Sequence, residues 1–403
     1  MTRRRAEAAL PVLFAAAILL VGGAVLFFIF TISPVHSDPA GVPSTASAAQ
    51  AERYSGALEE VRRLSRSLLV EENLPGLSVA VAVDGEIVWA EGFGWANVER
   101  RAPVTPLTRF RLGADSKPLT AAALALLHDR GRLDLDAPVQ RYVPAYPEKQ
   151  WTVTTRQLMG DVAGVHRIRG DNNDLVPGRH CASLDEALSI VAGEPLLFRP
   201  GTQYRYSIYG WVVASAVIAG AAGEPFPAFM TREVFKPLGM ESTALEEANE
   251  VPGTTSFYSP RSFMRTDLGV REAPPMDYSC FAGAGAFLST PSDLVRFGSS
   301  MLKPGLLKAE TIALLHTPLR LESGTSTEYA LGWKADSVHL AGAPVQMLGH
   351  RGSPVGGTIS LMTFPDLGLV IAAASNVTHA RGIAPLGLKV AEVFARPAEE
   401  RVH

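Results

Sequence analysis

The sequence predicts an α+β domain whose antiparallel sheet is assembled from strands at both ends of the domain, with helices between them. Two short strand-like runs lie at residues 77–89, and four more lie between residues 329 and 375. Between about residues 134 and 270 the apolar positions mostly follow helical spacing, and Pro and Gly separate the pieces. The domain is expected to span residues 51–397, followed by a tail at residues 398–403.

The N-terminus has the features of a membrane segment. Arg3, Arg4 and Arg5 precede an apolar run at residues 8–32, and roughly 20 apolar residues suffice to cross a bilayer. We interpret residues 1–7 as a cytoplasmic tail, residues 8–32 as an uncleaved signal anchor and residues 33–50, rich in Pro, Ser and Ala, as a flexible tether. The alternative is cleavage within the small residues 45–49.

This topology predicts a single-pass protein of the cytoplasmic (inner) membrane whose domain lies on the extracytoplasmic side. Disulfides form on that side. The only two cysteines, Cys181 and Cys280, are far apart in the sequence. Their pairing and two buried free thiols both remain open at this point.

The domain is expected to begin with a helix and a hairpin. From residue 51 to about residue 70, apolar side chains recur at helical spacing. Runs at residues 77–83 and 86–89 flank Asp84-Gly85, a strong hairpin signal.

Residues 111–130 predict a strand end, a turn and a helix. Gly113 interrupts the strand, Pro118 suits the first helical turn, and residues 119–127 are almost entirely Ala and Leu. Gly131 is the expected residue after the helix. The polar residues Asp115, Ser116 and Lys117 therefore lie at the N-terminal end of an apolar helix.

The remaining elements follow the same signals. A helix capped by Thr290 or Ser292 is expected within residues 287–297. The other helices are predicted at residues 155–159, 184–192, 209–221, 226–234 and 384–395, and the later strands at residues 329–335, 345–348, 358–364 and 369–375.

Residues 113–144 resemble the Ser-x-x-Lys region of the serine β-lactamase and penicillin-binding protein superfamily. Their sequence is GADSKPLTAAALALLHDRGRLDLDAPVQRYVP. The similarity is greatest to the class C-like branch, which includes a mitochondrial serine β-lactamase-like protein and its bacterial relatives. It implies a β-lactamase/DD-peptidase-like fold over residues 52–396. It also implies acyl-transfer chemistry, which needs a hydroxyl nucleophile, a proton acceptor and an oxyanion hole.

The resemblance places Ala114 where the family has its serine nucleophile, and Lys117 in the lysine position. Positions 114 and 117 lie on one helix face, because residues three apart are neighbours on a helix. Ser116 is the nearest hydroxyl, but it points about 100° away from Lys117 around the helix.

Two further motifs resemble those of the family. Tyr206 matches the tyrosine of Tyr-x-Asn, but Ile208 replaces the asparagine. Gly349-His350-Arg351-Gly352-Ser353 resembles the His-x-Gly form of the third motif. By this resemblance Lys117, Tyr206 and His350 are the candidate catalytic side chains, and Gly352 lets the substrate backbone approach closely. The backbone N–H groups of Ala114 and Ser353 would form the oxyanion hole.

A fourth family stretch, Ser-His-x-Ser-Gly, reads Gly160-Asp161-Val162-Ala163-Gly164. Ala114, Ile208, Asp161 and Ala163 thus depart together from the family pattern. The main hypothesis is a membrane-anchored pseudoenzyme that binds a peptide-, ester- or cell-wall-like ligand or a protein partner. The alternative is an active serine hydrolase of esterase, peptidase or β-lactamase type that uses Ser116 and Lys117.

Composition limits the other partners. The net charge of −3 and the absence of a basic run argue against nucleic acid. No Cys/His spacing resembles a metal site, and no cofactor is expected. The resemblance to a relative that assembles into filaments adds self-assembly as an expectation.

Overall fold

The chain folds around one large antiparallel sheet. The computed structural model describes residues 16–24, 34–47, 54–166, 179–246, 251–263 and 266–396. Strand β2 pairs with β13, so N- and C-terminal strands share the sheet, as predicted. The order across the sheet is β1 (Ser44–Ala46), β3 (Glu86–Asn97), β2 (Gly76–Val83), β13 (Leu369–Ser375), β12 (Thr358–Phe364), β11 (Ala343–Gly352) and β10 (Lys334–Leu340), with β4 (Ala102–Pro103) also on β3.

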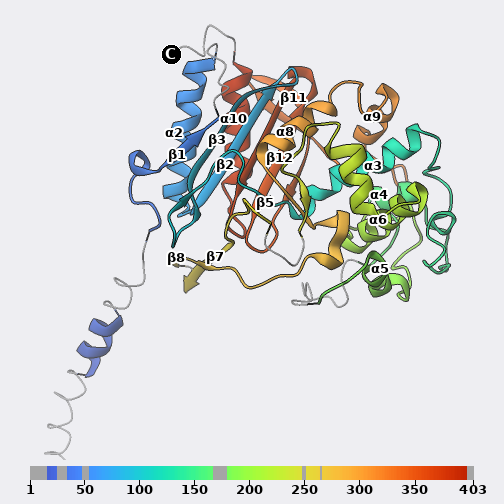
Figure 1. Cartoon of the computed structure of the whole chain (residues 1–403), viewed down its shortest axis with the longest axis horizontal. Helices are drawn as coiled ribbons and strands as arrows, with labels where there is room; N and C mark the ends of the chain where they lie inside the picture. Colours follow the sequence, from blue (N-terminus) through green and yellow to red (C-terminus); the bar gives the residue numbers. More distant parts are fainter. Residues whose placement is uncertain are drawn as a thin grey trace, which may run out of the picture.

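Helices cover both faces of this sheet, which lies between two layers of core (Figure 1). Helices α2 (Ser55–Glu71) and α10 (Ile383–Ala395) pack on one face, and α8 (Pro291–Ser300) packs on the other. Strand β2 is buried on both sides: Ala80 and Ala82 join the core beneath α8, whereas Val79 and Val81 join the core beneath α2 and α10. This alternation follows from the two-residue period of a strand.

The helical lobe lies beyond α8 (Figure 1). Its helices are α3 (Ser116–Asp129), α4 (Thr155–Met159), α5 (Leu184–Ala192), α6 (Ile208–Ala222), α7 (Phe226–Phe229), the π-helix η5 (Met230–Phe235) and α9 (Ala309–His316). Short 3₁₀ turns occur at η1 (Pro39–Gly41), η3 (Gly113–Asp115), η4 (Val139–Arg141), η6 (Ser279–Ala284) and η7 (Pro365–Leu367). Two small sheets complete the fold: β5 (Phe110–Arg111), β9 (Phe287–Ser289) and β6 (Ala244–Leu245), and the hairpin of β7 (Tyr258–Phe263) and β8 (Thr266–Glu272).

Local sequence signals account for the helix ends. Thr290, not Ser292, caps α8, because its hydroxyl accepts the Asp293 N–H at 3.1 Å. Gly131 follows α3 with a φ of +68°, the left-handed conformation in which glycine has no steric penalty.

The structure corrects three element predictions. The strand expected at residues 329–335 begins only at Lys334, because Gly332 turns the chain with a φ of +85°. The hairpin of β7 and β8 lies in a region expected to be mostly helical. The segment expected as one helix at residues 226–234 is α7 followed by η5.

The segment expected to be a flexible tether also differs from its prediction. Within residues 34–47, β1 pairs with β3. The buried ring of His36 stacks on Trp95 at a centroid distance of 6.5 Å, and His36 Nε2 lies 3.0 Å from the Pro75 carbonyl oxygen. Backbone pairing and side-chain packing therefore attach this segment to the domain.

The predicted membrane span at residues 8–32 lies mostly outside the described residues. Residues 16–24 within it form a helix whose side chains include Leu19 and Leu20, both about three-quarters exposed (75–76%). Across the described parts of the chain, no single helix is long and apolar enough to cross a membrane. Taken together, α6 and the α7–η5 helix are long and apolar enough for a membrane span, but the two helices are bent by 75° relative to each other.

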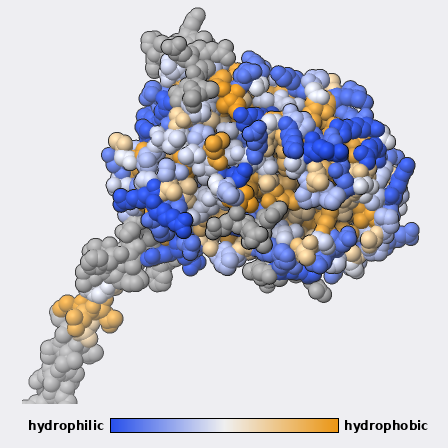
Figure 2. All heavy atoms as spheres, in the orientation of Figure 1, coloured by the Kyte–Doolittle hydropathy of each residue, from blue (hydrophilic) through white to orange (hydrophobic). Residues whose placement is uncertain are grey.

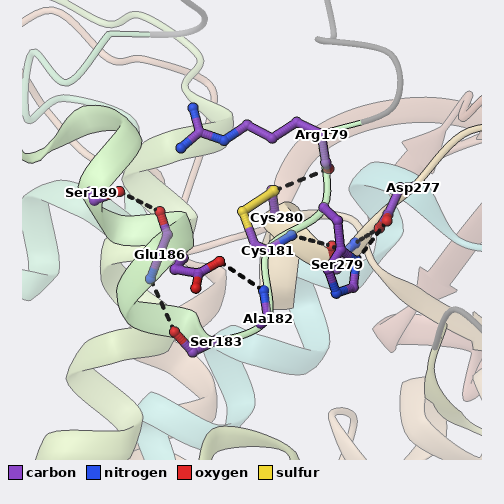
Figure 3. The surroundings of a disulfide bond; sticks show 10 residues. Arg179, Cys181, Ala182, Ser183, Glu186, Ser189, Asp277, Ser279 and Cys280 are labelled. Carbon is purple, nitrogen blue, oxygen red and sulfur yellow. Dashed lines mark hydrogen bonds and ion pairs between the residues drawn. A yellow bond between two sulfur atoms is a disulfide. The ribbon is translucent and has the colours of Figure 1, made fainter.

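A disulfide joins Cys181, just before α5, to Cys280 in η6, which answers the question left open by the sequence (Figure 3). The Cys181 N–H donates to Ser279 Oγ at 2.9 Å, next to the bridge. The bond links residues 99 apart in the sequence, so it restricts the unfolded chain over a long loop.

Replacing both cysteines, by Cys181→Ala with Cys280→Ala, should lower the free energy of unfolding by about 2–5 kcal/mol. Chemical denaturation monitored by circular dichroism measures this change. A reducing agent should lower the stability of the natural chain to that of the variant and leave the variant unchanged. Equal stability of the two oxidised proteins would contradict the prediction.

Candidate functional site

Lys117 is a fully buried lysine in the first turn of α3. Its Nζ lies 3.2 Å from the centroid of the Tyr206 ring and 5.8 Å from that of Trp211. A cation over an aromatic face is stabilised by the ring quadrupole, and more so where water is excluded. Two of the predicted site residues, Lys117 and Tyr206, are therefore in direct contact.

Asp161 is the buried acid that faces this lysine. Its side chain is 2% exposed, and its φ of +55° is unusual for a residue other than glycine. Burial raises the pKa of the Asp161 carboxyl to about 6, although the charge of Lys117 and the Ser207 N–H, which donates to Oδ1 at 3.1 Å, lower it. This residue departs from the family pattern, yet it supplies a counter-charge to Lys117.

The start of α6 positions Tyr206. Ser207 caps the helix, because its Oγ accepts the Gly210 N–H at 2.9 Å, and the same hydroxyl donates to the His166 carbonyl at 2.8 Å. Ile208 is half-buried and packs on the cluster of Tyr278 and Phe281. An apolar contact thus occupies the position at which the family motif has an amide.

His350, on β11, forms a second contact pair in the site. Its Nδ1 accepts the Arg351 N–H at 3.0 Å, so the ring proton resides on Nε2 and is donated to Tyr329 Oη at 3.1 Å. Burial, and then the charge of Lys117, lower the pKa of His350 to about 3. The ring is therefore neutral at ordinary pH, and Tyr329 retains its own proton for donation.

Asp115 lies behind His350. Its side chain is fully buried, and its Oδ1 is 3.8 Å from His350 Nδ1. Burial raises the pKa of the Asp115 carboxyl well above its usual range, against the smaller effects of the Gly352 N–H and the Arg351 charge. Asp115, His350 and Tyr329 consequently form a buried polar row beside Lys117.

Ala114 and Ser116 face different surroundings. Within residues 111–127, Ala114 is half-buried, whereas all the other residues are buried. The Ser116 hydroxyl has no exposed area and accepts the Phe287 N–H from β9 at 3.4 Å. The accessible position at the start of α3 thus carries a methyl group, and the neighbouring hydroxyl points into the protein.

Gly352 has a role within the protein itself. A Cβ atom there would lie 1.8 Å from the Leu112 carbonyl oxygen, so only glycine lets β11 approach the segment before α3. Ser353 follows and is exposed, with its Oγ 2.6 Å from His379 Nδ1. This approach brings the third motif next to Ala114.

A cavity of about 260 Å³ opens on this site. Its wall includes the rings of Tyr204, Tyr206 and Tyr329, together with His350 and the charged residues Lys334 and Arg351. Such a wall can bind apolar or aromatic groups and donate a few hydrogen bonds. Across the described residues, no group of three or more His, Cys, Asp or Glu side chains could hold a metal ion.

A family model described as beta-lactamase matches residues 61–391. The chain belongs to the beta-lactamase family. The predicted resemblance and fold class are therefore confirmed.

Several relatives agree with this membership. The mitochondrial serine beta-lactamase-like protein LACTB of Mus musculus is 29% identical over 440 residues, covering 85% of this chain and 79% of the relative. Penicillin-binding protein 4* of Bacillus subtilis is 24% identical over 336 residues, covering 79% and 72%. The octameric penicillin-binding protein homologue from Pyrococcus abyssi has the same fold, with a TM-score of 0.70 at 21% identity over 85% of this chain and 79% of that one.

The sequence does not predict two residues of this site. It predicts Tyr329 within a strand and Asp115 only as part of a polar cluster. Asp115 carried a usable signal, since a carboxylate next to an apolar helix must be exposed, paired or protonated. Tyr329 carried none, because the irregular chain around Gly332 determines its place.

Tyr329→Phe should lower the free energy of unfolding by about 1–3 kcal/mol, because the buried His350 Nε2–H would lose its acceptor. Denaturant unfolding of the two proteins provides the measurement. Tyr204→Phe is the matched control, since Tyr204 is 40% exposed and should change stability little. Equal effects of the two substitutions would contradict the proposed hydrogen bond.

Asp161 predicts a pH dependence of stability. Because its pKa is about 6 in the folded protein against 3.8 ordinarily, the folded state binds the proton more tightly than the unfolded state. Its contribution is therefore fully present below about pH 4 and decreases as the pH rises through about 6. Asp161→Asn removes this titration and keeps an acceptor for Ser207.

The free energy of unfolding of the natural chain, minus that of Asp161→Asn, should fall by on the order of 2–3 kcal/mol between pH 3.5 and pH 7. Urea unfolding at several pH values measures this difference. A difference independent of pH would mean that Asp161 titrates normally.

Proposed function

We propose that this chain is a membrane-anchored member of the beta-lactamase family that binds a small ligand or a partner and is impaired in acyl-serine chemistry. The observation that carries the proposal is the difference between the surroundings of Ala114 and those of Ser116, at the start of α3. Ala114 is accessible but has no hydroxyl, whereas Ser116 has a hydroxyl that is buried and bonded to Phe287. Acyl transfer requires an accessible nucleophile.

Lys117 has neighbours that stabilise its charged form. The centroid of the Tyr206 ring lies 3.2 Å from Lys117 Nζ, and Asp161 supplies a negative charge nearby. These interactions oppose the effect of complete burial, which favours a neutral amine. A lysine activates a hydroxyl only in its neutral form, and position 114 has no hydroxyl to activate.

The ligand that fits best is small and partly apolar. The tyrosine-lined cavity measures about 260 Å³, just below the range of about 300–1,000 Å³ that is typical of ligand sites. A peptide-, ester- or cell-wall-like fragment with one aromatic or apolar group would fill it. Tyr329 can donate a hydrogen bond to such a ligand, because its oxygen already accepts from His350.

We place this domain on the extracytoplasmic side of the inner membrane, anchored by one span at residues 8–32. The Arg3–Arg5 cluster and the apolar run support this topology. The disulfide between Cys181 and Cys280 agrees with an oxidising compartment.

Intact-mass measurement after exposure to a fluorophosphonate and to a penicillin tests the catalytic part. The natural chain should show no covalent adduct. Ala114→Ser restores the Ser-x-x-Lys spacing and should form an adduct slowly, because Ile208 and Asp161 still differ from the family pattern. Ser116→Ala in the Ala114→Ser background is the control and should leave that adduct in place.

A stoichiometric adduct on the natural chain, mapped to Ser116 and lost in Ser116→Ala, would contradict the proposal. It would establish instead the alternative of an active hydrolase that uses Ser116 and Lys117.

A further inference from the structure

A second and larger cavity, of about 580 Å³, lies apart from the tyrosine-lined one and shares no lining residue with it. Three parts of the chain form its walls: the N-terminal segment at residues 34–41, the turn between β3 and β4, and the β7–β8 hairpin. We define it as the N-terminal cavity. The catalytic resemblance assigns no role to it.

Three arginines from separate elements line this cavity: Arg101 from the β3–β4 turn, Arg261 from β7 and Arg271 from β8. Among the described residues, neither Arg101 nor Arg271 forms an ion pair with an acid. Guanidinium groups bind phosphate with paired hydrogen bonds and are weakly hydrated. Figure 2 shows strongly hydrophilic atoms at the lower left of the folded body.

Two acids also line the cavity, and each already accepts a hydrogen bond. Glu99 Oε2 accepts from Tyr258 Oη at 2.9 Å. Asp38 Oδ1 accepts the Ala40 N–H at 3.1 Å. Arg101 and Arg271, which have no acid partner among the described residues, therefore leave guanidinium groups in the cavity that can bind an anion.

The N-terminal wall is fixed in place. The Val35 N–H donates to Asn73 Oδ1 at 2.7 Å, and His36 packs between Trp95 and the Pro75 carbonyl. Val35 also lines the cavity, as do Val98 and Val270. The cavity thus offers apolar groups next to its arginines, as an amphipathic ligand requires.

The position of the wall suggests the source of that ligand. Pro34 lines the cavity, and the predicted span ends at residue 32. An extended chain covers about 3.3–3.6 Å per residue, which places the cavity within roughly 10 Å of the membrane surface. We propose that the N-terminal cavity binds the phosphate of an anionic phospholipid head group. The assignment of the ligand as a lipid depends on the membrane anchoring proposed above, whereas the proposal that the cavity binds an anion does not.

Titration calorimetry of the full-length protein in a neutral detergent tests this. The probes are short-chain dihexanoyl phosphatidylglycerol, dihexanoyl phosphatidylcholine and inorganic phosphate. The anionic lipid should bind at least tenfold more tightly than the zwitterionic lipid or phosphate, and added salt should weaken it. Arg101→Gln and Arg271→Gln should each weaken it about tenfold. Arg100→Gln is the matched control, because this exposed neighbour does not line the cavity.

Equal binding of the two lipids, or no effect of Arg101→Gln and Arg271→Gln, would overturn the proposal. Inorganic phosphate that binds as tightly as phosphatidylglycerol, with the same sensitivity to the variants, would overturn the lipid assignment. Carbonate extraction of membranes tests the anchor separately, since release of the protein refutes the anchor without changing the short-chain titration.

Discussion

The burial of one ammonium group determines the arrangement of this site. Lys117 is fully buried in the first turn of α3. Removing a charged amine from water costs several kcal/mol unless other groups compensate. The Tyr206 ring and the Asp161 carboxylate compensate here, and each comes from a loop in the helical lobe. The lysine on the central helix therefore dictates where the segments around residues 161 and 206 must lie.

The same charge sets the protonation of its neighbours. It opposes a second positive charge on His350 and thereby helps to keep that ring neutral. A neutral ring with Nδ1 occupied by the Arg351 N–H donates through Nε2, which orients the Tyr329 hydroxyl. Asp115 can remain in this environment because burial favours its protonated form. The protonation states of Lys117, His350 and Asp115 in this site therefore depend on their shared buried surroundings.

The fold could be predicted from the sequence largely because its signals are local or periodic. The Asp84-Gly85 turn, the Ala/Leu run of α3 and the alternating strands near the C-terminus each specify their own element. Within the site, the motifs predicted that Lys117, Tyr206 and His350 lie together, and the structure has Lys117 against the Tyr206 ring with its charge acting on His350. The catalytic roles of these residues stay a prediction. The places of Tyr329 and of the N-terminal segment could not be predicted, because they depend on tertiary contacts. Tyr329 is placed by the packing of Gly332 against α3 and Trp211, and the N-terminal segment by the pairing of β1 with β3. A short run of Pro, Ser and Ala gives no sign that a sheet edge is available for it.

That N-terminal segment has a consequence for the sheet as a whole. Strand β3 pairs on its outer side with β1 along residues 91–93 and with β4 along residues 95–97. An unpaired edge strand is a template for pairing with another chain. Of the described strands in the large sheet, β10 lies at the opposite end, where Tyr329 bridges it at Lys334. Two copies that joined through β10 would form one continuous sheet whose two remaining ends are formed by the short strands β1 and β4, and such short strands offer few backbone groups for further pairing.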